Sequence, residues 1–330
     1  MDPFCGRGTT NYASRVLGMS SVGIDASPVA TALTEAKLAN TTPGLIVKAA
    51  KIILDENVSP QEKPTGEFWE RLYSKNVLSK ICRLREELIK NCDSDTRKAL
   101  RAIILGSLHG PLHKTMFSYF SNQSPRTYAP KPKYAVKFWK KHKLEPPKVD
   151  VLEIIKKRAT RYYTKELLKG TGKIIVGDSR DDLIFSQLKG HKIDWIITSP
   201  PYYGMQTYIP DQWLRLWFLG GASNVTYASE GQVEHSSPEH FATELGKVWM
   251  NAKKVASKKA NLVIRFGAIN SRKNDPLVII KKSFEDSGWR IKTIVKAGSA
   301  ALGRRQALHF FVTPEEALTE YDIWASLKNN

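Results

Sequence analysis

The sequence predicts an α/β fold with a doubly wound, mainly parallel sheet that is interrupted by a mainly helical, basic insertion. Three observations support this prediction. Short apolar runs that end in a glycine or acidic turn occur near both ends of the chain, which is typical of buried parallel strands. Between residues 41 and 171 this alternation is lost and helical periodicity replaces it. Basic residues are concentrated in that same range.

The chain of 330 residues is long enough for about two domains. We assign residues 1–40 to the first part of an α/β domain, residues 41–171 to the insertion, and residues 172–330 to the remainder of the α/β domain. The hydrophobic content of 42% can fill a sizeable core. Two outer ranges, far apart in the sequence, are therefore expected to build one sheet.

In the first range, apolar periodicity and capping residues delimit the expected elements. A helix is expected over Thr10–Leu17 and a strand over the apolar run Ser21–Asp25. The next helix is expected over Pro28–Ala39, because Ser27 suits the N-cap and proline suits the first turn.

The third range returns to alternating strands and helices. Strands are expected at GKIIV, which ends in an acidic turn, and at KIDWIIT, which ends in a proline turn. The other expected elements are a helix at Pro238–Ser257, a strand at Ala260–Phe266, a helix at Asp275–Ser287, and an antiparallel pair formed by Trp289–Lys296 and Ala307–Thr313.

The insertion has helical periodicity over Phe68–Lys90 and Thr96–Leu108, followed by a proline-rich basic tract that we expect to be an exposed loop. The chain has 51 Lys and Arg against 32 Asp and Glu, a formal charge of +19. Residues 97–169 hold 18 of these basic residues and only 4 of the acidic ones. This imbalance predicts contact with nucleic-acid phosphates, although a solvated surface that keeps the protein soluble would have the same composition.

The basic tract also contains aromatic side chains, which could support the backbone or stack on bases. These aromatic residues are Tyr128, Tyr134, Phe138 and Trp139. The candidate nucleic-acid contacts are Arg126, Lys131, Lys133, Lys137, Lys140 and Lys141.

Several protein classes are disfavoured by composition. No window approaches the roughly 20 apolar residues of a spanning helix, and the first 20 residues lack a signal-peptide pattern, so we expect a cytoplasmic protein with no membrane partner. The three cysteines lack metal-ligand spacing, and Gly110 and Pro111 break the helix that would bring His109 and His113 together. We therefore expect no metal site.

Three turns carry the residues expected to bind a nucleotide cofactor. The stretch DPFCGRGTT has two glycines, spaced by one residue, that let the backbone pass close to a ligand. Asp25 follows the next strand and suits the hydroxyls of a ribose, and Asp178 in the turn GDSR suits an adenine amino group. Each carboxylate taken alone could equally be a helix cap.

The stretch TSPPYYG at Thr198–Gly204 follows an expected buried strand. With this motif, the chain resembles the amino-directed DNA methyltransferases: DPFCGRGTT, GID and GDSR match their cofactor motifs, and TSPPY matches their catalytic motif. The resemblance covers residues 1–40 and about 172–313. It implies a Rossmann-like methyltransferase sheet, the cofactor S-adenosylmethionine, and a duplex DNA substrate with a flipped base. The implied cofactor residues are Asp2, Phe4, Gly6, Gly8, Thr9, Asp25, Asp178 and Ser179, and the implied catalytic residues are Ser199, Pro200, Pro201 and Tyr202.

The residue types of this motif fit amino-group methylation. The lone pair of a cytosine amino nitrogen is delocalised into the ring, so the nitrogen attacks a methyl donor well only when acceptors such as Ser199 Oγ and the Pro200 carbonyl draw electron density onto it. Tyr202 offers a face for the extruded base. Serine before the proline pair is usual in enzymes that make N4-methylcytosine. N6-adenine methylation, an RNA substrate and a binding subunit without activity of its own remain alternatives.

Methylation at cytosine C5 needs a cysteine nucleophile, usually after a proline. The residues that precede the three cysteines are Phe4, Ile81 and Asn91, which argues against that chemistry.

One feature departs from the family pattern. In the family a buried strand precedes the first cofactor motif, whereas only Met1 precedes Asp2 here. We expect that the strand comes from a second polypeptide or another part of this chain, or that the chain is a fragment. A second polypeptide is the expected partner, and the chain alone is expected to be a poor enzyme.

Overall fold

The computed structural model describes residues 1–55, 58–111, 118–123, 131–204, 209–225, 237–268, 274–299 and 319–328. The chain forms two compact units. Unit 1 comprises Met1–Thr34, Thr171–Gln206 and Glu230–Asn330, and unit 2 comprises Glu35–Gly170 and Thr207–Ser229. Unit 2 therefore contains most of the range 41–171, together with a segment that follows the TSPPY motif.

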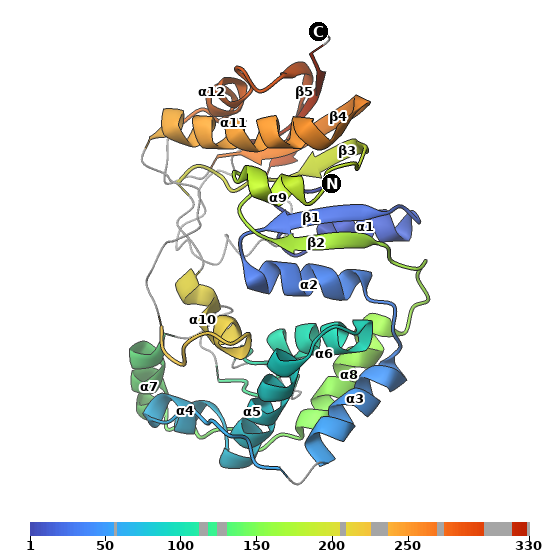
Figure 1. The fold of residues 1–330 in the computed structure, drawn as a ribbon. Helices are drawn as coiled ribbons and strands as arrows, with labels where there is room; N and C mark the ends of the chain where they lie inside the picture. The colour runs from blue at the N-terminus through green and yellow to red at the C-terminus, as the bar shows by residue number, and fades with distance from the viewer. Residues whose placement is uncertain are drawn as a thin grey trace. The chain divides into compact units, whose positions relative to one another are not determined.

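Unit 1 is a mixed α/β structure whose elements come from both ends of the chain (Figure 1). Its strands are β1 (Ser21–Asp25), β2 (Gly172–Val176), β3 (Ile193–Thr198), β4 (Ala256–Gly267), β5 (Trp289–Ser299) and β6 (Thr319–Leu327). Its helices are α1 (Thr9–Val16), the first part of α2 (Pro28–Leu38), α9 (Asp182–Ser186), α11 (Pro238–Val255) and α12 (Pro276–Ser283). The strands and helices expected in the two outer ranges are confirmed, apart from the last strand.

The strand pairs β1–β2 and β3–β4 are parallel, as the apolar runs predicted. Met1 and Asp2 lie between β1 and β3 and hydrogen-bond to both. Asp2 N donates to Val22 O at 2.8 Å, and Ile197 N donates to Met1 O at 2.9 Å. These two residues join the pair β2–β1 to the four-stranded order β3–β4–β6–β5. The amino ends of the parallel strands thus share one edge, and the turns that follow them share the other.

The last strand is where the sequence prediction and the structure differ. Trp289–Lys296 does form a strand, but β5 pairs in antiparallel register with β6 at Thr319–Leu327. Strand β6 also pairs with β4 and so lies between β4 and β5. The expected partner, Ala307–Thr313, lies outside the described residues.

The core of unit 1 lies on one face of the sheet, under α9, α11 and α12. Ile196, Leu262 and Ile323 are fully buried there with Trp249 of α11. On the opposite face, Ile197, Val263 and Trp324 are cross-strand neighbours on β3, β4 and β6. Ile197 and Trp324 are 42% and 41% exposed, so this face presents apolar side chains to solvent.

Unit 2 is helical in the described residues. Its helices are the last part of α2, α3 (Pro43–Asp55), α4 (Glu67–Leu72), α5 (Lys75–Lys90), α6 (Asp95–Leu105), α7 (Pro132–Lys141), α8 (Val151–Tyr163) and α10 (Ile209–Phe218). An aromatic cluster forms part of its core, in which Phe68 lies 5.5 Å from Trp139 and 5.2 Å from Trp213 between ring centroids. The regular elements described between residues 41 and 171 are thus helices.

Two expectations about unit 2 are corrected. The helix expected over Phe68–Lys90 is two helices, because Tyr73 and Ser74 are extended between α4 and α5. The basic tract, expected to be a loop, forms α7 over Pro132–Lys141. Amphipathic spacing explains this helix: Ala135 and Trp139, four residues apart, are fully buried while the lysines stay outside.

Across the part of the chain that the structure describes, no helix is both long enough and apolar enough to cross a membrane. Within the same residues, no group of three or more His, Cys, Asp or Glu side chains is arranged to hold a metal ion.

Candidate functional site

The site begins at the turn Asp2–Gly8, which leads into α1. Gly8 caps this helix with φ 71°, and a Cβ there would lie 2.7 Å from the Thr34 side chain. The turn therefore requires glycine at this position. A Cβ at Gly6, in contrast, would meet only the Phe4 carbonyl oxygen, at 3.9 Å. The backbone at Gly6 therefore has open space beside it.

Asp25, at the end of β1, is tied to this turn. Its Oδ2 accepts from the Gly6 N–H at 2.8 Å, and its Oδ1 accepts from the Ser27 N–H at 2.9 Å. The side chain of Asp25 therefore organises two turns in addition to the ribose role expected for it. Burial raises the pKa of its carboxyl above the usual value, against the lowering effect of the two backbone N–H groups.

Asp2 joins the first turn to the TSPPY motif. Its Oδ1 accepts from Phe4 N at 3.1 Å and from Thr198 Oγ1 at 2.7 Å. Only 4% of Asp2 is exposed, and burial raises the pKa of its carboxyl. In this geometry Asp2 acts inside the fold, as a link between the ends of two neighbouring strands.

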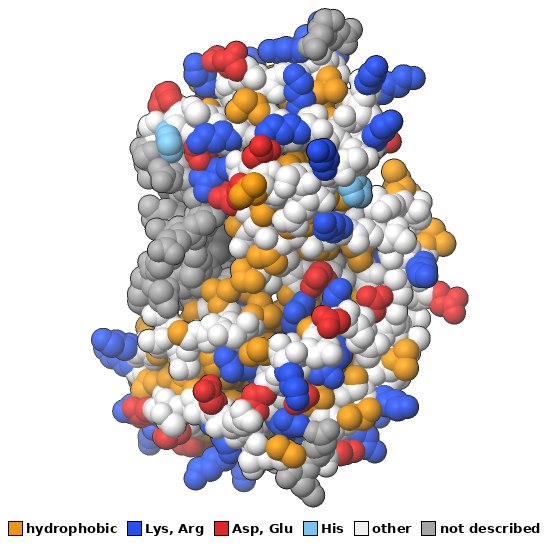
Figure 2. Space-filling model, in the orientation of Figure 1, with side chains coloured by type: hydrophobic (Ala, Val, Ile, Leu, Met, Phe, Trp, Pro, Cys, Tyr) orange, Lys and Arg blue, Asp and Glu red, His pale blue; other side chains and the backbone are white. Residues whose placement is uncertain are grey.

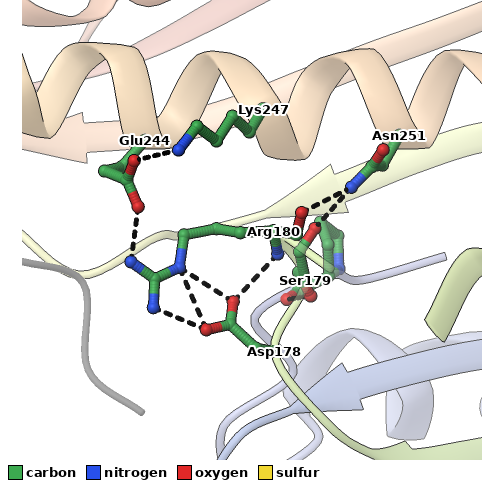
Figure 3. A network of polar contacts seen from close by, with 7 residues as sticks. Asp178, Ser179, Arg180, Glu244, Lys247 and Asn251 are labelled. Carbon is green, nitrogen blue, oxygen red and sulfur yellow. Dashed lines mark hydrogen bonds and ion pairs between the residues drawn. The ribbon is translucent and has the colours of Figure 1, made fainter. Parts of the chain in front are cut away.

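The third turn, after β2, is held in the same way. Ser179 Oγ donates to Pro3 O at 2.6 Å, and Gly177 N donates to Asp25 O at 2.9 Å. Asp178 forms an ion pair with Arg180, which in turn contacts Glu244 on α11 (Figure 3). The Arg180 guanidinium keeps the pKa of the Asp178 carboxyl below its usual value although burial raises it.

In the TSPPY motif, the four predicted catalytic residues differ in exposure. Ser199 is exposed, Pro201 is half-buried and Pro200 is buried. Tyr202 is only 8% exposed; its ring packs edge-on against Phe266 at 5.5 Å between centroids, and its hydroxyl donates to Glu320. Tyr202 was expected to offer an open face to a base; the structure places it in the core instead, because β4 and β6 pack around it.

Phe4 is half-buried beside α11, and Thr9 is exposed at the start of α1. Cys5 lies inside the turn, where burial raises the pKa of its thiol to about 12. A thiol with this pKa is protonated at neutral pH, which agrees with a packing role for Cys5.

The predicted nucleic-acid residues lie in unit 2. Lys131, Lys133, Lys137, Lys140 and Lys141 are exposed at or within α7. Lys133, Lys137 and Lys140 line one shallow hollow together with Pro132 and Val136. Arg126 lies outside the described residues. Figure 2 shows that Lys and Arg side chains are also spread over other parts of the surface, with Asp and Glu between them.

The aromatic side chains of the basic tract do not all face outward. Trp139 is fully buried and its Nε1 donates to Gln123 O at 2.9 Å, so it supports the helix and is closed to a base. Tyr134 is 51% exposed and lies beside Phe138 at 6.4 Å between ring centroids. Tyr128 lies outside the described residues.

Arg180, Glu244 and Glu320 were not among the residues predicted from the sequence. Arg180 lies in the GDSR turn, but its contact with Glu244 is 64 positions away, and Glu320 meets Tyr202 118 positions away, so no local pattern marks these pairs. A charged residue inside an apolar helix face is the one signal that points to Glu244, which is 5% exposed on α11.

Comparison with known proteins finds no matching family model and no matching curated protein. Among solved structures, the chain is similar to the rRNA methyltransferase aviRa from Streptomyces viridochromogenes, with 14% identity and a TM-score of 0.33 over 98% of this chain and 74% of that one. It is also similar to a protein from Thermus thermophilus described as a DNA modification methylase, with 16% identity and a TM-score of 0.26 over 47% of this chain and 52% of that one. These values are too low to define a family or an activity.

Proposed function

We propose that this chain is an S-adenosylmethionine-dependent methyltransferase that modifies an exocyclic amino group in nucleic acid. The observation that carries the proposal is the convergence of four motif-bearing turns at one edge of the sheet of unit 1. Direct bonds link them: Gly6 to Asp25, Pro3 to Ser179, and Asp2 to Thr198. In doubly wound sheets, ligands bind at the carboxyl ends of the strands, which is this edge.

The residues at this edge fit the cofactor. Gly6 leaves room for a ligand beside the backbone, and the carboxylates of Asp25 and Asp178 are both partly exposed. Asp25 would accept from the ribose hydroxyls and Asp178 from the adenine amino group. S-Adenosylmethionine supplies, when bound, an electrophilic methyl group. Phe4, Gly8 and Thr9 would complete the wall of the site.

The acceptor end of the site is the turn at Thr198–Tyr202. Ser199 is exposed and its Oγ can accept from an amino group, while the two prolines have no N–H and leave their carbonyls free of helical bonding. These acceptors would raise the electron density on the amino nitrogen and hold it in line with the methyl group. With serine before the proline pair, cytosine N4 in DNA is the preferred target, and N6 of adenine or RNA are the alternatives.

Nucleoside mass spectrometry tests this proposal. DNA and RNA are incubated with the protein and S-adenosylmethionine labelled at the methyl carbon, then digested. N4-methylcytosine in DNA is the expected product, and the Ser199→Ala variant is expected to lose most of it. Ser186→Ala, an exposed serine in α9, is the matched control and should retain it. Absence of labelled nucleoside from both substrates, with no binding of the cofactor, would overturn the proposal.

A second candidate is a nucleic-acid-binding subunit that acts only with a partner. The apolar face of the sheet favours it, since Trp195 and Trp324 contact each other edge-on at 6.3 Å and both are 41% exposed. Parallel sheets are normally covered by helices on both faces. We propose that a second polypeptide covers this face, and that its addition raises methyl transfer and thermal stability together. Full activity of the chain by itself would argue against this candidate.

A further inference from the structure

Asp178 is held along one edge of its carboxylate by Arg180, two residues further along the same turn. Arg180 Nε lies 3.0 Å from each of the two oxygens, and Nη2 lies 2.5 Å from Oδ2. The backbone N–H of Arg180 also donates to Oδ1 at 2.9 Å. Figure 3 shows the guanidinium lying beside the carboxylate. The bidentate geometry restricts both the position and the plane of the Asp178 side chain.

Glu244 holds the other side of the same guanidinium. Its Oε2 accepts from Arg180 Nη1 at 2.5 Å, and its Oε1 accepts from Lys247 Nζ at 2.6 Å. The Glu244 side chain is 7% exposed, whereas that of Asp178 is 32% exposed. The buried end of the network is therefore on α11 and its open end is at Asp178.

The turn itself is attached to the same face of α11. Asn251 Nδ2 donates to the carbonyls of Ser179 and Arg180, at 3.3 and 3.0 Å. Positions 244, 247 and 251 follow one another at helical spacing, so one helix face anchors both the backbone and the side chains of the turn.

If the pair of Asp178 and Arg180 only stabilised the surface, it would not need the further contacts with α11. Burying a carboxylate such as Glu244 is costly unless it is paired, and exposed pairs add little stability. Here two acids and two bases balance, and the more exposed of the two carboxylates belongs to a residue at the ligand-binding edge of the sheet. This arrangement suits a group that must stay ionised and oriented for a ligand.

We propose that Arg180 and Glu244 are positioning residues that aim the solvent-facing edge of Asp178 at the exocyclic amino group of the cofactor's adenine. They thereby set the preference for adenine over a base that carries a carbonyl group at C6. This inference rests on the proposed function and deepens it, because it names the chemical group that the third turn recognises and the residues responsible.

The test compares the cofactor's product with the deaminated analogue of that product, by calorimetry on the full chain. S-Adenosylhomocysteine carries an amino donor at C6 of its base, and S-inosylhomocysteine carries a carbonyl acceptor there. The unaltered chain is expected to bind the adenosyl compound at least about tenfold more tightly, the scale of a hydrogen bond to a charged group. In Arg180→Gln the ratio is expected to fall to about twofold or less, and in Glu244→Gln to an intermediate value.

Arg265→Gln is the matched control. Arg265 forms a bidentate pair with Asp322, at 2.8 Å for both bonds, on β4 and β6 of the same unit. Its loss should leave the ratio unchanged. If Arg180→Gln does not fold, Arg180→Lys keeps the charge without the planar fork and should also lower the ratio.

The outcomes separate the two claims. An unchanged ratio in the Arg180 and Glu244 variants would overturn the positioning role while leaving the proposed function intact. If the unaltered chain binds both compounds equally, Asp178 does not read the amino group and the inference is wrong. If the unaltered chain binds neither compound, the proposed function itself fails.

Discussion

Single residues at the candidate site have structural roles in addition to the ligand-binding roles proposed for them. Asp25 accepts two backbone N–H groups and is only partly exposed, so its carboxylate fixes the turn at Gly6 as well as facing the ligand edge. The same holds for Asp178, which is paired with Arg180 and still accessible. At this scale, the candidate side chains are organised by hydrogen bonds within their own turns and to the neighbouring turns.

Replacement of Asp25 by Asn tests this double role. The amide keeps one acceptor but loses the charge and brings an N–H group next to the N–H of Gly6 or Ser27. We expect cofactor binding to weaken by about 1–3 kcal/mol, the scale of hydrogen bonds to a charged group. Calorimetric titration with S-adenosylmethionine measures this. Asp194→Asn, which alters an exposed pair with Ser257, is the control, and equal affinities of the two variants would contradict the prediction.

At the scale of elements, α7 has a structural face and a charged face to which we assign a proposed role in nucleic-acid binding. Its buried face, Ala135 and Trp139, attaches it to unit 2, while its lysines remain in solvent. A helix of this kind presents charges at fixed spacing instead of on a mobile loop. Phosphate contacts made by such charges depend steeply on salt, because binding releases counterions.

Replacement by Gln of four lysines at or within α7 tests the nucleic-acid surface. The variant changes Lys131, Lys133, Lys137 and Lys140 together. If each contacts a phosphate, the slope of log affinity against log salt is expected to become shallower by up to about 3 to 4. Fluorescence anisotropy with duplex DNA at several salt concentrations measures the slope. A control variant removes four exposed lysines of unit 1: Lys192, Lys258, Lys259 and Lys292. Identical slopes in the two variants would show that α7 is a solvated surface.

The buried side chain of His109, which follows α6, is expected to make the stability of unit 2 depend on pH. Burial holds the pKa of its imidazole well below the usual value, with a smaller contribution from Arg215. Below about pH 6.5 the unfolded chain binds a proton that the folded chain does not, so stability falls as pH falls, by at most about 1.4 kcal/mol per pH unit.

Urea unfolding between pH 7 and pH 5 checks this expectation. The His109→Leu variant removes the titrating group and should show a flatter pH dependence, whereas the exposed His191→Gln should behave like the unaltered chain. If His109→Leu loses stability with falling pH as steeply as the unaltered chain, the group responsible lies elsewhere.

At the scale of the whole molecule, the chain builds two units with separate cores. The buried tryptophans Trp249 and Trp289 belong to unit 1, and Trp69 and Trp139 belong to unit 2. Each core can unfold cooperatively, so we expect two calorimetric transitions. S-Adenosylmethionine should stabilise only unit 1. At 100 times its dissociation constant it should raise the free energy of unfolding of that unit by about 2.7 kcal/mol.

The Asp25→Asn variant is the control for this measurement, since it should show both transitions and a smaller shift with cofactor. A single transition that moves as a whole would show that the two cores unfold together.

Local sequence determined most elements of this protein. Apolar runs, capping residues and turn glycines act over a few residues, and so they predicted β1, β2, β3, α1, α2 and α11 with small errors at the ends. The same short-range signals marked the turns that meet at the candidate site. They did not predict α7 as a helix, because prolines and lysines dominated the pattern while burial of Trp139 decided the structure.

Only the tertiary structure decided which distant groups meet. The bond between Asp2 and Thr198 spans 196 positions, the contact between Arg180 and Glu244 spans 64, and β6 lies between two strands that precede it in the sequence. Packing against Phe266 likewise turned Tyr202 into a core residue. These outcomes depend on the burial of surfaces that come together only when the sheet assembles, and for that reason local propensity carries no record of them.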